Sequence, residues 1–133
     1  MAFQFSVSAR NAALDAIETA IGVSPTLELR SGTAPANCAA VATGTVLATM
    51  ALPADFLAAA SAGAKALLGI WQDASADAAG TVGHFRINQG GTCHCQGSVT
   101  ITGGGGDMTL DNNVLALAQQ VTITAFTLTA GGA

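Results

Sequence analysis

Short runs of alternating apolar and polar residues follow one another along most of this chain. The clearest runs cover residues 81–88, 92–102 and 120–130, and each has the period of two that is typical of a half-buried β-strand. Further strands are expected over residues 26–32, 45–52, 66–72 and 107–110. Gly, Asp and Asn residues separate these runs at even spacing. The pattern therefore predicts an all-β fold, an antiparallel β-sandwich or jelly roll.

One segment near the N-terminus has the period of a helix instead. Its apolar residues recur at the spacing of helical turns, and they are Leu14, Ile17 and Ile21. We expect an α-helix over residues 9–21, with Ser8 as its N-cap. Gly22 follows the last apolar residue and is expected to end the helix. The sequence therefore predicts one N-terminal α-helix in addition to the β-sandwich.

The remaining segments complete a single-domain organisation. Residues 3–7 alternate and predict a short strand before the helix, while residues 54–65 fit either a helical turn or a loop. A chain of 133 residues is long enough for one core. We therefore expect one domain over 1–133, with a strand and helix within 3–22 and the β-sandwich over 26–130.

The last predicted strand changes its apolar face partway along. Val121 and Ile123 share one face, whereas Phe126 and Leu128 lie on the other. Either a bulge near Ala125 restores a single buried face, or both faces are buried. In the second case a partner subunit would cover the strand from outside.

The stretch "CHCQGSV" brings together residue types that bind zinc. On a regular strand, however, Cys93 and Cys95 share the apolar face with Val99, and His94 points to the polar face. Zinc ligands must converge to within roughly 2.0–2.3 Å of one point, which neighbouring strand residues cannot do. We expect buried cysteines, an exposed histidine and no metal site.

The preceding strand gives the expected register of this hairpin. Its apolar residues must share the face of the cysteines, and a three-residue turn at 89–91 allows this. The predicted pairs are Ile87 with Cys93, Phe85 with Cys95, and Arg86 with His94. His84 then lies on the polar face beside an arginine, which would repel a metal cation.

The three cysteines leave at least one thiol free, as is usual for a protein folded in a reducing cytosol. A bridge between Cys93 and Cys95 is not expected, because residues two apart on a strand lie near or beyond the roughly 7 Å limit between Cα atoms. Cys38 could reach either of them. We expect reduced thiols, and the sequence leaves the pairing of Cys38 open.

Charge argues against several classes of partner. The net charge is −4, and the four basic residues, Arg10, Arg30, Lys65 and Arg86, are scattered along the chain. Binding to nucleic acids or to anionic membranes needs clustered Lys and Arg, so neither partner is expected. No apolar run approaches the roughly 20 residues of a membrane span, and "MAFQFSVSAR" lacks the features of a secretion signal.

Other candidate chemistry is sparse. The glycine run 103–106 lacks the Lys and Ser/Thr of a phosphate loop and is expected to form a turn. Trp71 with Asp73 and Asp77 could form a sugar platform, although a single tryptophan is more often a core residue. No catalytic set can be assembled on one face. We predict no enzymatic activity, no catalytic residues and no cofactor.

The chain as a whole resembles short virion structural proteins of tailed bacteriophages. The segments "ALDAIETAIGVSPTLELRSGTAPANCAA", "GTVLATMALPADFLAAA", "GIWQDASADAAGTVGHFRI" and "GGGGDMTLDN…VTITAFTLTA" carry this resemblance. It implies a capsid decoration (cement) protein, made in the host cytoplasm and bound to the major capsid protein on the outside of the virion. The implied partners are the major capsid protein and copies of the chain itself.

Two alternatives remain open at this point. One is a tail fibre, baseplate or receptor-binding component with a sugar site near Trp71, and the other is a small enzyme or metal-binding domain, against which the face analysis argues. For an assembly role, the expected interface residues are Phe3, Phe5, Gly103, Gly104, Gly105, Gly106, Phe126 and Leu128.

Overall fold

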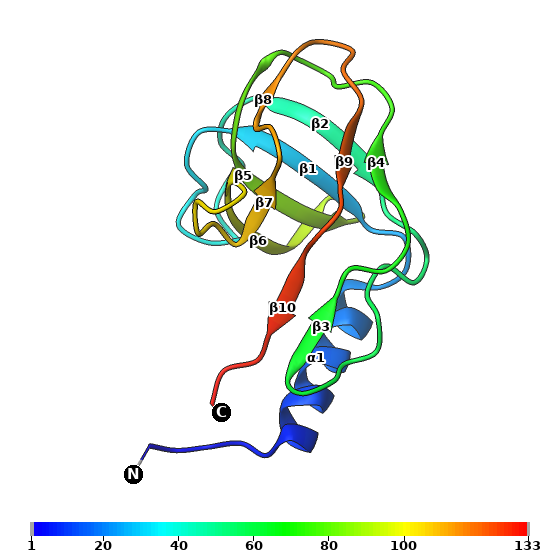
Figure 1. Cartoon of the computed structure of the whole chain (residues 1–133), viewed down its shortest axis with the longest axis vertical. Helices are drawn as coiled ribbons and strands as arrows, with labels where there is room; N and C mark the ends of the chain where they lie inside the picture. The colour runs from blue at the N-terminus through cyan, green and yellow to red at the C-terminus, as the bar shows by residue number, and fades with distance from the viewer. Residues whose placement is uncertain (1, 133) are drawn as a thin grey trace.

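The structure is a computed structural model, and it describes residues 2–132. Its elements are α1 (Val7–Ile21), β1 (Thr26–Ser31), β2 (Val46–Ala51), β3 (Ala64–Ala66), β4 (Trp71–Asp73), β5 (Gly80–Gln89), β6 (Thr92–Ile101), β7 (Met108–Leu110), β8 (Val114–Leu115), β9 (Val121–Ile123) and β10 (Thr127–Thr129). Figure 1 shows two parts, a curled sheet and a narrower stalk that holds α1, β3, β10 and both ends of the described chain. The prediction of a β-rich chain with one N-terminal helix is confirmed.

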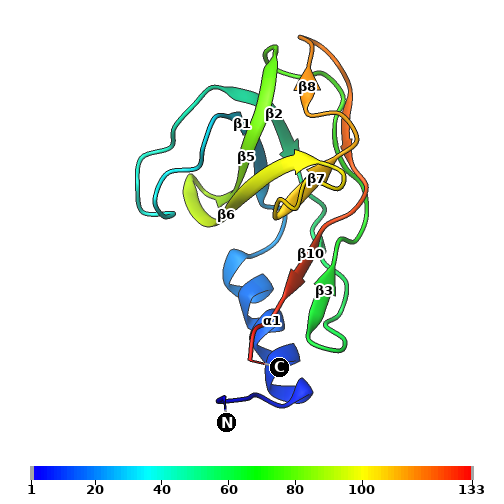
Figure 2. The ribbon, with the colours of Figure 1, turned by 60° about the vertical axis from the view of Figure 1, so that its left-hand side comes forward.

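The main sheet differs from the predicted antiparallel sandwich. Its strands run in the order β2-β1-β5-β6-β7, with β8 added beside β5. The β6–β7 pair is parallel, so the sheet is mixed, and it curls into a half-barrel (Figure 2). The pairs β3–β10 and β4–β9 are separate two-stranded ribbons, which do not join into a second facing sheet.

Glycines explain how a parallel pair forms over so short a connection. Parallel neighbours usually need a crossover of a dozen or more residues, yet Val99 of β6 already pairs with Met108 of β7. Gly103 and Gly105 have φ of 90° and 80°, in the region that favours glycine. The predicted turn at 103–106 is present, but it returns the chain in the same direction instead of reversing it.

Aromatic side chains fill the concave side of the curled sheet. Trp71 lies at the centre, with its ring centroid 6.2 Å from that of Phe56 and 5.5 Å from that of Phe126. The ring of Phe85 meets Phe126 edge to face at 5.6 Å. All four side chains are buried. The β4–β9 ribbon, with the segments that carry Phe56 and Phe126, therefore closes the core over the open side of the half-barrel.

The helix begins two residues earlier than predicted. Ser6, and not Ser8, is the N-cap, because its hydroxyl accepts a hydrogen bond of 3.1 Å from the N–H of Ala9. Gly22 ends the helix as expected, with φ of 89°. The residues before the helix are not a strand. They are extended, and the N–H of Phe5 donates to the carbonyl of Gly132 at 2.7 Å.

The last predicted strand, 120–130, is split into β9 and β10. β9 pairs with β4, while β10 pairs with β3, and residues 124–126 between them belong to neither strand. This break turns the chain so that Val121, Ile123 and Phe126 are all buried in one core. Burial of the strand therefore needs no partner subunit.

The segment before β4 also differs from its prediction. The expected strand over 66–72 is interrupted, with β3 ending at Ala66 and β4 starting at Trp71. Residues 54–63 form an irregular loop, which is one of the two alternatives that the sequence left open for 54–65. Its isolated bridge between Leu57 and Leu67 buries both Phe56 and Leu57 against the core.

Candidate functional site

The Cys-His-Cys stretch contains a bulge that places its two cysteines on opposite faces. Cys95 pairs with Ile87, but Cys93 pairs with Asn88, and the register shifts between these pairs. His94 is the extra residue and is exposed. The predicted register is therefore wrong, and so is the shared face of the cysteines, because a bulge inverts the alternation beyond it.

The turn of this hairpin explains the shift. It contains two residues, Gly90 and Gly91, instead of the predicted three. Their φ values of 58° and 81° are those of a tight hairpin turn whose central residues are both glycine. A two-residue turn shortens the connection, and the bulge at His94 restores the match between Phe85, Ile87 and the apolar face of β6.

Cys93 forms a disulfide with Cys38, with 5.2 Å between the Cα atoms. The expectation that all thiols are reduced is therefore wrong, and the pairing that the sequence left open is settled. Cys95 is free and packs against the hydrophobic core. Burial, and next to it the negative charge of Asp107, raises the pKa of the Cys95 thiol above 9.0.

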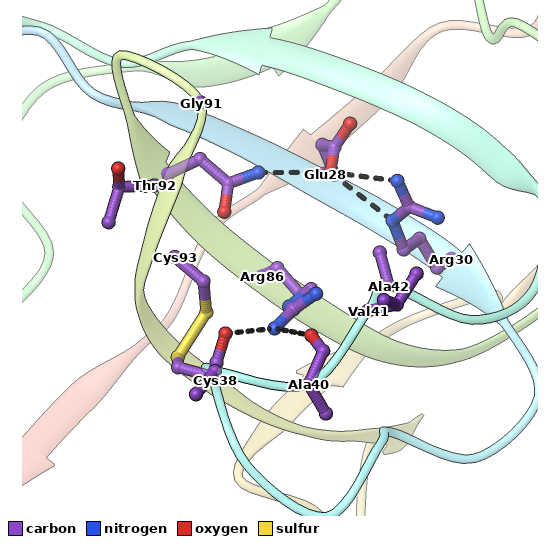
Figure 3. Close-up of a pocket in the computed structure, with 12 residues that line it drawn as sticks. Glu28, Arg30, Cys38, Ala40, Val41, Ala42, Arg86, Gly91, Thr92 and Cys93 are labelled. Carbon is purple, nitrogen blue, oxygen red and sulfur yellow. Dashed lines mark hydrogen bonds and ion pairs between the residues drawn. A yellow bond between two sulfur atoms is a disulfide. The ribbon is translucent and has the colours of Figure 1, made fainter.

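The disulfide fixes one point of a long loop, residues 32–44, which we call the strap. The strap lies over the polar face of β1, β5 and β6, and its carbonyl groups accept hydrogen bonds from side chains of that face (Figure 3). The bonds are Arg86 Nη2 to Cys38 O (2.8 Å) and Ala40 O (3.2 Å), Gln96 Nε2 to Pro35 O (2.7 Å), and Arg30 Nη1 to Thr43 O (3.3 Å) and Gly44 O (3.4 Å). The disulfide and these three side chains thus hold a segment without regular secondary structure at four points.

His84 belongs to the same layer. Its side chain is fully buried, and Nδ1 lies 2.9 Å from the carbonyl oxygen of Gly32. A carbonyl can only accept, so Nδ1 carries a proton and donates it in this hydrogen bond. Nε2 finds no partner among the described residues. The expectation that His84 and Arg86 share a polar face is confirmed, but this face is covered by the strap.

Arg86 is buried without a carboxylate beside it. Only 4% of the residue is exposed, and no acidic oxygen of residues 2–132 lies within 4.0 Å of its guanidinium. Glu28 stands opposite Arg86 on β1, but it accepts from Arg30 at 3.2 Å and from Asn88 at 3.0 Å instead. Arg86 Nε also has no hydrogen-bond partner in the described chain.

A pocket of about 580 Å³ opens beside this guanidinium. Its lining comes from the strap, from the polar face of the sheet and from the hairpin turn, as Figure 3 shows. Arg30 and Arg86 are two of the four basic residues of the whole chain, and Glu28 is the acidic residue that lines the pocket. The pocket is thus a locally positive site in an acidic protein.

The predicted interface residues do not come together. Phe3 and Phe5 are 82% and 52% exposed at the end of the stalk, with their ring centroids 5.1 Å apart. The glycines at 103–105 are exposed at the edge of the curled sheet, far from that end (Figure 1). Phe126 is a core residue and Leu128 is partly buried against the core, so neither presents an apolar surface.

The residues of the suggested sugar platform have structural roles. Trp71 is fully buried, and its Nε1 donates to Leu68 O at 3.2 Å. The carboxylates of Asp73 and Asp77 both bind Thr49 at the edge of β2, at 2.9 Å and 2.7 Å. No aromatic face is therefore available for stacking on a sugar at this tryptophan.

The stalk contains a second buried charge, which does have partners. Lys65 Nζ lies 2.7 Å from Asp15 and 3.5 Å from Glu18, both on α1. Burial by itself would lower the pKa of Lys65, but the two carboxylates outweigh this and raise it above 10.5. The hydrogen bond from Lys65 in turn lowers the pKa of Asp15 below 3.8. This cluster attaches β3 to the helix.

Among residues 2–132, no group of three or more His, Cys, Asp or Glu side chains is arranged to hold a metal ion. No helix in this part of the chain is long and apolar enough to cross a membrane. Comparison with protein-family models, with curated proteins and with solved structures finds no match to this chain. The resemblance to phage virion proteins stays a prediction.

The sequence alone did not reveal the strap. Its residues, "GTAPANCAAVATG", contribute backbone carbonyls, which every residue has, so no side-chain pattern indicates their role. The usable signal was on the sheet, where His84, Arg86 and Asn88 form a row of hydrogen-bond donors at alternate positions of β5. A row of this kind also fits a face that is open to water, so the sequence did not show that a loop covers it.

Proposed function

We propose that this chain is a non-enzymatic structural protein of a phage virion, a capsid decoration (cement) protein on the outer surface of the major capsid protein lattice. The observation that carries the proposal is the exposed pair of phenylalanines at the end of the stalk. A decoration protein needs a segment that inserts into a neighbouring surface, and it needs a folded body that stays outside.

The stalk end has the composition of an attachment segment. Phe3 and Phe5 are joined there by the exposed Val7 at the start of α1. Fully burying one large apolar side chain contributes roughly 1.5–3 kcal/mol, so three of them supply a substantial part of a binding free energy. An apolar groove between neighbouring capsid subunits is the partner that fits this end of the molecule.

The charge of the chain agrees with a position outside the capsid. A net charge of −4 is unfavourable beside packaged nucleic acid, and it is acceptable on a surface that faces solvent. The disulfide and the strap fasten the curled sheet, which supports the role of a durable body. Copies of the chain on adjacent capsid positions would also contact one another.

The test is electron cryo-microscopy of virions whose genome encodes this chain. We expect its density at many positions over the head, with the stalk end directed to the major capsid protein. Density confined to the tail would contradict the proposal and favour the fibre or baseplate alternative.

A binding assay sharpens this test. The double variant Phe3→Ser with Phe5→Ser should bind to emptied heads at least about tenfold more weakly, since tenfold corresponds to only about 1.4 kcal/mol. The matched control is Val114→Ser with Leu117→Ser, which removes two exposed apolar residues from the curled-sheet end. The control should bind like the unmodified protein, and circular dichroism should show both variants folded.

A further inference from the structure

We propose that the pocket under the strap is a carboxylate-binding site, with Arg86 as the residue that binds the anion. This inference does not depend on the proposed virion function. It rests on the burial and the contacts of one arginine, on the charges around it, and on the pocket that opens beside it.

The first argument is the missing counter-charge. A guanidinium keeps its proton at any ordinary pH, so burial cannot neutralise Arg86 as it can neutralise a lysine or a carboxyl group. Buried ions are normally paired with an opposite charge. Arg86 has no such partner among residues 2–132, and the carbonyl groups of Cys38 and Ala40 satisfy hydrogen bonds without supplying charge.

Lys65 shows what the same chain does elsewhere with a buried cation. That side chain is also almost fully buried, and it has two carboxylates within 3.5 Å. Glu28 stands in the corresponding position for Arg86 but is turned to Arg30 and Asn88. The chain therefore leaves the Arg86 site with one positive charge unmatched, and a ligand can supply the match.

The second argument identifies the ligand class. Arg30 and Glu28 compensate each other, so the pocket carries a net charge of one and suits a monoanion better than a phosphate dianion. Arginine donates to carboxylates through planar, charge-assisted hydrogen bonds. Around it, Ala39, Ala42 and the exposed Val41 form a small apolar border. A carboxylate on a short apolar stem fits both features.

Two sources offer this chemistry, a free small carboxylate and the side chain of Asp or Glu on a partner protein. The pocket volume of about 580 Å³ admits either. The experiment therefore uses two probes, sodium acetate and the capped peptide acetyl-Gly-Glu-Gly-amide. The corresponding Gln peptide removes the charge and keeps the shape.

The measurement is a nuclear magnetic resonance titration of the ¹⁵N-labelled, oxidised chain. We expect acetate to cause saturable shifts in the amide signals of residues 38–42 and 91–93, while sodium chloride at equal ionic strength does not. Tighter binding of the Glu peptide than of acetate assigns the site to a partner side chain, whereas binding of acetate alone assigns it to a free carboxylate. Equal, non-saturating shifts with acetate and chloride would overturn the proposal.

Variants test the role of Arg86 itself. Arg86→Gln should weaken binding by about tenfold or more, as expected for the loss of a charge-assisted hydrogen bond. Arg86→Lys keeps the positive charge, so it should lose less affinity for acetate than Arg86→Gln. If Arg86→Gln does not fold, the affinity of Arg86→Lys is compared with that of the unmodified protein instead. The control is Arg10→Gln, which removes one positive charge from the stalk. Unchanged acetate affinity in a folded Arg86→Gln protein would contradict the assignment.

Discussion

The two faces of the curled sheet are covered in different ways. On the concave side, Phe85 and Ile87 of β5 pack against aromatic and aliphatic side chains, as in any hydrophobic core. On the other side, the alternate residues His84 and Arg86 of the same strand are equally buried but lie under a loop. One strand thus has two buried faces, only one of which is apolar.

The difference lies in how much each cover depends on geometry. Apolar packing tolerates small shifts, because dispersion and the hydrophobic effect have little directional preference. The strap depends on directed hydrogen bonds from Arg86, Gln96 and Arg30 and on one covalent bond to Cys93. A loop without regular secondary structure can therefore cover a sheet if its carbonyl groups are placed against a row of donors.

The largest expected effect is on the concave face. Phe85→Ala should lower the free energy of unfolding by roughly 3–5 kcal/mol, because it removes a buried ring and leaves a cavity beside Phe126. Urea denaturation measures this loss. Ile101→Ala on β6 is the control, since Ile101 is exposed and should cost no more than about 0.5 kcal/mol. A loss below 1 kcal/mol for Phe85→Ala would mean that the concave face is not the main core.

The covered polar face should respond to removal of the disulfide. Cys38→Ser combined with Cys93→Ser should lower the free energy of unfolding by roughly 2–4 kcal/mol, because the bond closes a long loop. Hydrogen exchange should become faster over residues 32–44 while β5 stays protected. A reductant should produce the same change in the unmodified protein and none in the double variant. If reduction leaves thermal unfolding unchanged, the strap does not depend on this bond.

The smallest effect is chemical and concerns Cys95, the cysteine on the concave face. Its raised pKa means that less thiolate is present at any given pH than in a free cysteine, and the thiolate is the reactive form. Native oxidised protein should therefore react with iodoacetamide at pH 8 more slowly than a cysteine peptide, and its rate should increase with pH as more thiolate forms. Intact-mass measurement should find a single adduct. Reaction at the rate of the peptide would contradict the burial of this thiol.

The sequence predicted the hairpin faces better than the hairpin register. Alternation correctly placed Phe85, Ile87 and Cys95 on the concave face. It failed at Cys93, because a bulge is a local exception that alternation cannot reveal. The helix shows a similar limit, since Ser6 and Ser8 both suit an N-cap, and only the structure shows that the Ser6 hydroxyl accepts from the N–H of Ala9.

The candidate site could not be predicted from the sequence, for a different reason. Its cover consists of backbone carbonyl groups, and its disulfide joins residues 55 apart in sequence. The parallel β6–β7 pair was missed as well, because a short glycine-rich segment usually indicates a reversal. Both features arise from long-range placement of the backbone, whereas residue patterns report mainly on side chains.

The hydrogen bond from Phe5 to Gly132 brings the two ends of the described chain to one place at the tip of the stalk. The two described ends of the chain therefore lie side by side, an arrangement that allows a domain to be inserted into another chain. A short linker could join residues 2 and 132, and new ends could be opened in the exposed glycine segment 103–105 to give a circular permutant. Cargo fused to either described end would emerge beside the other end, at the tip of the stalk (Figure 1).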